Sequence, residues 1–290
     1  APAGWLLISL WELLLPRQFL SFGMAVNSGR VLMLLLHVAS AYFLYRITKR
    51  LSGSDMAALG AAIVFSISPL ALFYQRMVLL DNIMTFWVLL ILYFALAPGG
   101  RLITLLVSGS AFGIALLTKE NAVFFVPVIG YLLYTEAKGR PNFRFAVAGW
   151  AFTAWAVLSL YPLYALLKDE LLPSSLHNLA TPNGGAHVSL ISTLIWQGTR
   201  SQGSILDPNS LFWEFSFGRW LPKDAFILAA GGIATMINVI IGTLNHRFRR
   251  DYLVVAGMAL AYAFYLARGS FMLEFYVVPL LPFLCMNLAM

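Results

Sequence analysis

The sequence predicts an all-α membrane protein, a polytopic helical bundle of about nine spans with short interfacial helices and an ordered outer loop. The bulk composition supports this fold class. Hydrophobic residues make up 60% of the 290-residue chain and charged residues 11%, and the mean hydropathy is +0.81. A soluble domain carries about 25% charged residues. The arrangement of the sequence supports it too, because the apolar residues fall into long runs separated by short polar stretches.

The first apolar run covers residues 5–15 and ends at Pro16 and Arg17. It is shorter than the roughly 20 residues that cross a bilayer, so it predicts an interfacial or re-entrant helix. The longer runs that follow are each close to spanning length. They cover residues 29–46, 56–74, 79–97, 102–118, 121–136, 146–166, 225–244, 251–267 and 271–290.

Basic residues predict the orientation of these runs. Alternate short loops hold ten of the 19 Lys and Arg residues, which by the positive-inside rule makes those loops cytoplasmic and the N-terminus external. These ten residues are Arg46, Lys49, Arg50, Arg101, Lys138, Arg140, Arg144, Arg247, Arg249 and Arg250. We therefore expect an integral protein of the cytoplasmic (inner) membrane. The formal charge of +7 reflects this distribution of basic residues over short loops and not a nucleic-acid patch, so no nucleic-acid partner is expected.

This topology divides the chain into four segments. Residues 1–27 are an outer juxtamembrane segment, 28–167 and 224–290 are membrane helices, and 168–223 form one long outer loop. Loops of this length are commonly functional. Its candidate acceptor or substrate residues are His187, Gln197, Arg200 and Asp207.

No metal site is predicted. His177 and His187 share the outer loop without the ligand spacing of a zinc site, and the single cysteine, Cys285, lies within an apolar run.

A second population of charges lies at the outer ends of the expected spans. Its members are Arg30, Arg76, Asp81, Lys119, Glu120, Arg268 and Glu274. Carboxylates are too short to reach water easily from the membrane, so three acid–base pairs at one depth indicate a polar cavity that could hold an anion. Arg17, Lys168 and Lys223 are expected to be interfacial anchors only.

The stretch 68–82 holds two of these charges. Within one helix, Arg76 and Asp81 would point about 140° apart and could not meet. The run from Met56 to Ala97 must reverse direction, however, and Pro69 followed by the polar residues 74–76 predicts the end of a helix. A turn at 77–80 would bring Arg76 and Asp81 to one cavity.

With these residues identified, the chain resembles the GT-C membrane glycosyltransferases, in the branch of protein O-mannosyltransferases and the lipid A aminoarabinose transferase. The resemblance rests on the order of four short motifs. They are Asn27-Ser28-Gly29-Arg30-Val31, the stretch from Ser68-Pro69 through Arg76 to Asp81, Leu117-Thr118-Lys119-Glu120-Asn121, and the Tyr276-x-x-Pro279-x-x-Pro282 segment that follows Glu274.

The resemblance implies a transferase that uses a polyprenyl-phosphate-linked sugar on the outer membrane face. Arg76, Lys119, Arg268 and Arg30 would bind the donor phosphate, and Asp81 or Glu120 would act on the acceptor hydroxyl. The implied partners are the lipid-linked sugar and membrane lipid. The protein could also work within a membrane complex, and a divalent cation could assist, although none is firmly implied.

One departure from the family leaves other readings open. The family carries its principal acidic residue in the first outer loop, and Ala1–Trp5 resembles the end of that loop. We expect either that the chain is part of a longer protein, or that Asp81 or Glu120 substitutes, or that there is no catalysis. A non-catalytic subunit that retains the fold and a lipid or sugar transporter or flippase therefore remain alternatives.

Overall fold

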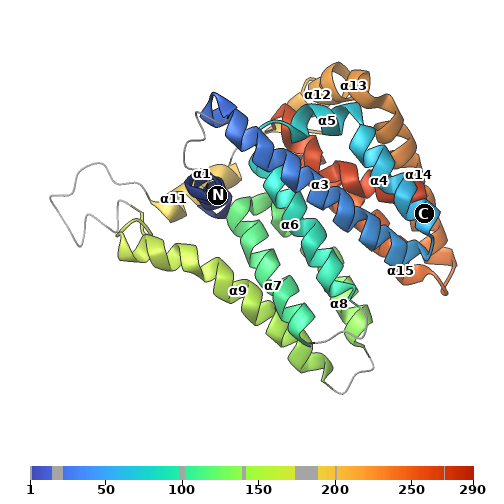
Figure 1. Cartoon of the computed structure of the whole chain (residues 1–290), viewed down its shortest axis with the longest axis horizontal. Coiled ribbons are helices and arrows are strands. Elements are labelled where there is room, and N and C mark those ends of the chain that lie inside the picture. The colour runs from blue at the N-terminus through green and yellow to red at the C-terminus, as the bar shows by residue number, and fades with distance from the viewer. Residues whose placement is uncertain are drawn as a thin grey trace.

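Long apolar helices run alongside one another in the computed structural model of the chain (Figure 1). The structure describes residues 2–14, 22–97, 102–138, 142–173, 189–199, 201–270 and 272–290. Within these ranges the only strands are β1, Ser201–Ser204, and β2, Arg268–Ser270, which pair antiparallel with Ser204 opposite Arg268. The predicted all-α membrane bundle is confirmed.

The helices follow the predicted apolar runs. In chain order the longer ones are α1 (Pro2–Leu14), α3 (Ala25–Ser52), α4 (Asp55–Ile67), α5 (Pro69–Gln75), α6 (Leu80–Ala95), α7 (Leu102–Thr118), α8 (Val126–Ala137), α9 (Phe143–Leu167), α11 (Leu190–Thr199), α14 (Gly231–Leu244), α15 (Arg249–Ala267) and α16 (Leu281–Ala289). Short 3₁₀ helices precede two of them, η1 at Glu120–Phe125 and η4 at Glu274–Leu280.

Among the described residues, three helical segments are long and apolar enough to cross a membrane, namely Ala25–Ser52, Phe143–Leu167 and Leu211–Leu244. The bent pair α4–α5 could form a fourth span, and several shorter apolar helices lie beside these. The protein is therefore an integral membrane protein, while the count of about nine spans stays a prediction.

The predicted end of a helix near Pro69 is confirmed. The chain bends by 60° between α4 and α5, and the Ser68 hydroxyl caps α5 by accepting a hydrogen bond from Ala71 N at 3.2 Å. Pro69 occupies the first turn of α5, where its missing N–H has no helical partner to lose. The chain leaves α5 after Gln75 and enters α6 at Leu80, so 70–85 is not one helix.

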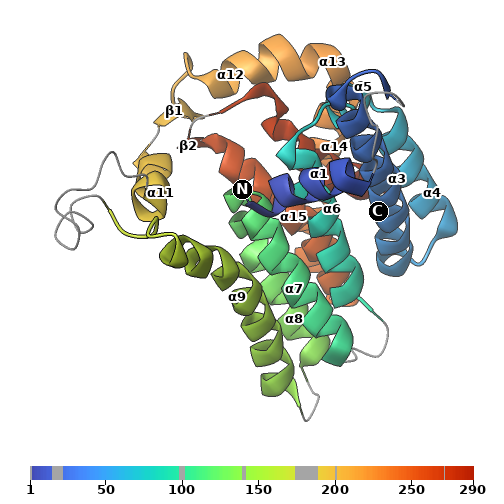
Figure 2. The same ribbon diagram turned by 60° about the vertical axis from the view of Figure 1, so that its left-hand side comes forward.

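Part of the expected outer loop is helical. The segment from Leu211 to Ala230 consists of α12 (Leu211–Phe215), η2 (Ser216–Trp220), α13 (Leu221–Ala225) and η3 (Phe226–Ala230), and it continues into α14. Asp224 interrupts the helical geometry with φ −155° and ψ 72°. Figure 2 shows α12 and α13 lying across one end of the bundle, above the ends of the other helices.

Helix α6 lies at the centre of the bundle. It packs on α3, α7 and η4, and buried residues occur along its length from Asp81 to Ala95. Helix α7 also packs closely on α9. The contact is made by two glycines of α7 that are four residues apart. A Cβ at Gly109 would lie 2.3 Å from the carbonyl oxygen of Trp150, and one at Gly113 would lie 2.7 Å from that of Ala154. Such small-residue contacts let membrane helices approach closely.

The α7–α9 contact can be tested with one substitution. Gly113→Val places atoms where α9 already lies, and overpacking of this kind costs about 1–3 kcal/mol. We expect a lower midpoint of thermal unfolding for the detergent-purified protein. Gly130→Val is the matched control, since a Cβ at Gly130 meets no atom within 4 Å. Equal midpoints for the two variants would contradict the packing described here.

Candidate functional site

A buried ion pair connects α6 to the end of α7. Asp81 lies in the first turn of α6, and Lys119 follows the last residue of α7. The Lys119 Nζ donates to both carboxylate oxygens of Asp81, at 2.6 and 2.7 Å. Asp81 is 1% exposed and Lys119 8% exposed.

The surroundings of Lys119 hold the ammonium in one place. The Tyr276 ring of η4 lies over it, with its centroid 3.7 Å from Nζ. The negative face of an aromatic ring attracts a cation, and this attraction is greater where water is excluded. Lys119 is therefore held between a carboxylate from α6 and a ring from η4.

Asn82, the neighbour of Asp81, fixes the turn that precedes α6. Its Nδ2 donates to the carbonyl oxygens of Tyr74, Gln75 and Met77, at 3.1, 3.3 and 2.9 Å. These carbonyls lie where α5 ends and the regular helical hydrogen bonds stop, although the Tyr74 carbonyl also accepts from Met77 N at 3.0 Å. One amide side chain thus sets both the reversal of the chain and the start of α6.

A second polar cluster surrounds Glu274, two residues before Tyr276. Its carboxylate accepts a hydrogen bond from the Tyr74 hydroxyl at 3.1 Å and lies 3.7 Å from Lys223 Nζ and 3.5 Å from Arg219 Nε. Lys223 also donates to the Tyr74 hydroxyl at 3.2 Å. The Trp220 indole donates to the Glu274 carbonyl at 2.7 Å, so η2 and α13 are tied to the start of η4.

Aromatic rings join Lys119 to a second cation. The Arg268 guanidinium lies 4.7 Å from the Phe124 ring centroid and 5.2 Å from that of Tyr265. The Tyr265 and Tyr276 centroids are 6.1 Å apart, which places Lys119 and Arg268 on one aromatic cluster.

Beside Glu274, another aromatic ring likewise lies between two cations. The Phe73 ring lies 4.1 Å from Lys223 Nζ and 5.6 Å from the Arg76 guanidinium.

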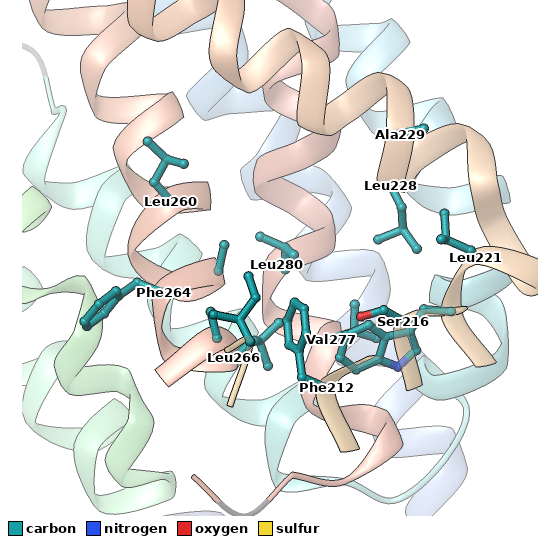
Figure 3. A pocket seen from close by; sticks show the side chains of 14 residues that line it. Phe212, Ser216, Leu221, Leu228, Ala229, Leu260, Phe264, Leu266, Val277 and Leu280 are labelled. Carbon is teal, nitrogen blue, oxygen red and sulfur yellow. The ribbon is translucent and has the colours of Figure 1, made fainter. Parts of the chain in front are cut away.

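An apolar cavity of about 500 Å³ opens beside these clusters. It lies between the segment 205–229, the end of α15 and η4, and Figure 3 shows Phe212, Leu266 and Val277 around it. Phe264 and Ala267, close to Arg268 in the chain, also line it. An apolar chain placed there would have its polar end near the cations.

The outer charges do gather at one end of the bundle, but with other partners than expected. Asp81 pairs with Lys119 and not with Arg76, because the turn after α5 leaves Arg76 exposed over Phe73. Glu274 pairs with Lys223 and Arg219 and not with Arg268. Two of the three carboxylates at this depth, Asp81 and Glu274, are therefore paired with cations other than their neighbours in the sequence.

The other predicted site residues lie nearer the surface. Glu120 is exposed at the start of η1, next to Lys119. Arg30 is exposed and donates to Asn27 at 3.3 Å. Asp207 is exposed, and its Oδ1 accepts a hydrogen bond from Asn209 N at 3.0 Å.

Some predicted residues cannot be placed. His187 and Arg200 lie outside the described residues, and the side chain of Gln197 does too, although Gln197 falls within α11.

Sequence reasoning missed two residues of the second cluster, Lys223 and Arg219, and the nearby Asp224. Lys223 is not merely an interfacial anchor, because it contacts Tyr74, Phe73 and Glu274. Arg219 and Asp224 were not considered at all. The Lys223-Asp224 pair beside Pro222, just before an apolar run, was an available signal, since a carboxylate at a span boundary needs a partner. That partner is Ser68, whose hydroxyl donates to Asp224 at 2.6 Å.

A divalent cation finds no ready site in the parts of the chain that the structure describes. No three His, Cys, Asp or Glu side chains gather there in a way that could hold a metal ion. Both oxygens of the buried carboxylate, Asp81, already accept from Lys119. These residues therefore do not fit a bound metal.

Solved structures share the fold of this chain. ArnT from Cupriavidus metallidurans bound to undecaprenyl phosphate matches with a TM-score of 0.63 and 15% identity, over 93% of this chain and 47% of that one. Its apo structure matches with a TM-score of 0.60 and 16% identity, over 93% and 46%. An oligosaccharyltransferase from Archaeoglobus fulgidus, tethered to an acceptor peptide, matches with a TM-score of 0.51 and 13% identity. That match covers 99% of this chain and 40% of the other.

The chain thus spans less than half the length of the solved structures it matches. Those proteins are GT-C glycosyltransferases, and the likeness confirms the fold predicted from the four motifs. No curated protein matches the sequence. The sequence profile of the dolichyl-phosphate-mannose-protein mannosyltransferase family matches residues 17–164, just over half of the 290 residues. The chain therefore belongs to the dolichyl-phosphate-mannose-protein mannosyltransferase family.

Proposed function

We propose that this protein transfers a sugar from a polyprenyl-phosphate donor to a hydroxyl of a protein or lipid acceptor. The main support for this proposal is the buried Lys119. Asp81 holds its ammonium group at the end of the bundle where the family's motifs meet. The basic loops at the opposite end support an extracytoplasmic active face in the cytoplasmic membrane. ArnT, which shares the fold, was solved with undecaprenyl phosphate bound, and this supports a lipid-linked donor.

The cations serve the departing phosphate. When the bond between sugar C1 and the phosphate oxygen breaks, its electron pair leaves with the lipid phosphate, and fixed positive charge stabilises that anion. Lys119 and Arg268 lie on one aromatic cluster and are the first candidates, with Arg76 and Arg30 nearer the surface. Lys119 is only 8% exposed, so the Tyr276 ring must turn aside as the phosphate arrives.

The two candidate carboxylates take different roles. Both oxygens of Asp81 accept from Lys119, which suits Asp81 to positioning the ammonium. Glu120 is exposed beside Lys119 and is the better candidate to accept the proton of the acceptor hydroxyl. The new bond joins the acceptor oxygen to C1, the old bond releases the lipid phosphate, and the proton goes to Glu120.

The apolar cavity suits the lipid chain. Its lining is almost wholly hydrophobic, and it lies between helices where a membrane lipid can enter from the side. Phe264 on its wall is followed within four residues by Arg268. A polyprenyl chain placed in the cavity would bring its phosphate towards the cations.

Removing one or both charges of the buried pair tests this proposal. Asp81→Asn leaves the Lys119 ammonium buried without a carboxylate, which should cost about 3–5 kcal/mol of stability. Asp81→Asn with Lys119→Met removes both charges and should restore most of that stability. Sugar transfer from a labelled polyprenyl-phosphate sugar should nevertheless stay at least about 100-fold below the wild-type rate, as after loss of an electrostatic stabiliser.

The control for the double variant is the ion pair between Glu136 and Arg250 at the opposite end of the bundle. Glu136→Gln with Arg250→Gln should leave transfer unchanged. Wild-type transfer by the Asp81/Lys119 double variant would remove the pair from the site. A wild-type protein that binds the lipid without transferring sugar favours a non-catalytic subunit, and one that moves the lipid across liposome membranes favours a transporter.

The proposed binding of the lipid chain in the apolar cavity can be tested separately. Ala229→Phe narrows the cavity that Ala229 lines, so affinity for a long polyprenyl phosphate should fall more than affinity for a short-chain analogue. The control is Ala148→Phe, at an exposed position of α9. Binding of both lipids to detergent-purified protein can be measured by isothermal titration calorimetry. An equal loss for the two chain lengths would show that the lipid tail lies elsewhere.

A further inference from the structure

Four residues near the C-terminal end of α3 surround a cavity that the proposed transfer does not use. Tyr45, Arg46, Lys49 and Arg50 line this space of about 390 Å³. It lies at the far end of the bundle from the Asp81–Lys119 pair, because Asp81 and Tyr93 lie near opposite ends of α6 and Arg50 contacts Tyr93.

Aromatic rings hold two of the cations in place. The Arg50 guanidinium lies 4.1 Å from the Tyr93 ring centroid and donates to the Tyr93 carbonyl, which ties α3 to α6. The Arg46 guanidinium lies 5.8 Å from the same ring and donates to the Tyr42 hydroxyl at 2.6 Å. An arginine has five N–H donors, and each of these hydrogen bonds occupies one. Both arginines are half-buried, so little side-chain freedom is left to lose when a ligand binds.

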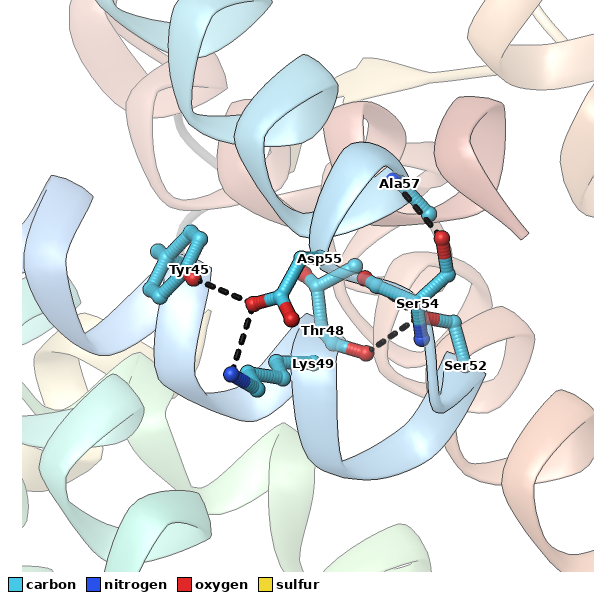
Figure 4. Close-up of polar contacts among 7 residues, drawn as sticks. All are labelled: Tyr45, Thr48, Lys49, Ser52, Ser54, Asp55 and Ala57. Atoms are coloured by element: carbon cyan, nitrogen blue, oxygen red, sulfur yellow. Dashed lines mark hydrogen bonds and ion pairs between the residues drawn. The ribbon is translucent and has the colours of Figure 1, made fainter.

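One carboxylate touches the group and partly offsets its charge. Figure 4 shows Tyr45 and Lys49 both pointing at Asp55, whose Oδ1 accepts from the Tyr45 hydroxyl at 2.6 Å and lies 2.6 Å from Lys49 Nζ. Asp55 lies in the first turn of α4 and is well exposed. Three cations beside one carboxylate leave a net positive charge around the cavity.

The cavity also lies at the end of an apolar stripe. Leu35, Val38 and Tyr42 are 53%, 68% and 50% exposed, and with Tyr45 and Lys49 they follow at spacings of three and four residues along one face of α3. Because α3 is a candidate membrane span, this face meets lipid chains. A molecule lying along the stripe would place its polar end against the cations.

We infer that Tyr45, Arg46, Lys49 and Arg50 form a binding site for the phosphate headgroup of an anionic membrane lipid. The stripe favours a lipid over free phosphate, because it supplies a surface for acyl chains. Basic pockets between membrane helices commonly bind such headgroups. The inference is independent of the proposed sugar transfer, since it uses none of the same residues.

Phosphatidylglycerol is the probe for this site. The protein is purified in a zwitterionic detergent, phosphatidylglycerol is titrated in, and retained lipid is counted by native mass spectrometry. Arg46→Gln with Lys49→Gln should weaken binding roughly tenfold or more, since each cation near a membrane surface contributes on the order of fivefold. Arg50 is kept because it ties α3 to α6. Asp55→Asn removes the competing carboxylate and should strengthen binding about two- to fivefold.

Matched variants separate a site from general charge. Arg247 lies on the loop before α15 and Arg249 is the first residue of α15, and both are exposed. Arg247→Gln with Arg249→Gln removes the same charge and should leave binding unchanged. If both double variants weakened phosphatidylglycerol binding equally, the proposal would be overturned. The basic residues of α3 would then serve only to orient the protein in the membrane. Displacement of the lipid by millimolar inorganic phosphate would show an anion site that does not select a lipid, and would also overturn it. Poor folding cannot explain stronger binding after Asp55→Asn. Weaker binding by an Asp55→Asn variant that keeps the wild-type midpoint of thermal unfolding would contradict the charge argument.

Discussion

The contact between Asp81 and Lys119 is the constraint on which the rest of this end of the protein depends. A charge removed from water is costly unless a partner and hydrogen bonds compensate, and here both carboxylate oxygens receive the same ammonium. For this to happen, α6 must begin within reach of the end of α7, and η4 must carry Tyr276 over the pair. The turn fixed by Asn82 and the bend at Ser68 meet the first requirement. The contacts from Trp220 to η4 meet the second.

Irregular backbone gathers at the end of the bundle that carries the proposed chemistry. Membrane helices satisfy their own backbone groups, so a broken helix needs side chains or protein surroundings to replace the lost partners. Ser68 and Asn82 provide such partners, and Asp224 accepts from Ile227 N where its own helix is interrupted. The same residues join α4, α5 and α6 to the helix that starts at Leu211. The polar side chains that complete these breaks therefore also build the walls of the candidate site.

Much of the fold could be predicted because membrane helices follow a strong signal in the sequence. Apolar runs located the helices, and Pro69 with the polar residues after it marked a true end of a helix. The gathering of Asp81, Lys119, Glu274 and Arg268 at one end followed from topology alone. Their partners could not be predicted, because pairing depends on the rotation of each helix and on the segment that lies across them. Lys223 and Glu274 are 51 positions apart in the sequence, and only the path of α13 over η4 brings them together.

The most direct test of the central claim is an experimental structure of the protein with a polyprenyl phosphate bound. The account predicts that the phosphate lies at about 3 Å from Lys119 Nζ, which is hydrogen-bonding distance. It also predicts that Asp81 still holds the ammonium, that the Tyr276 ring has moved aside, and that the lipid chain enters the cavity lined by Phe264 and Ala229. A bound phosphate elsewhere, with Lys119 still covered by Tyr276, would contradict it.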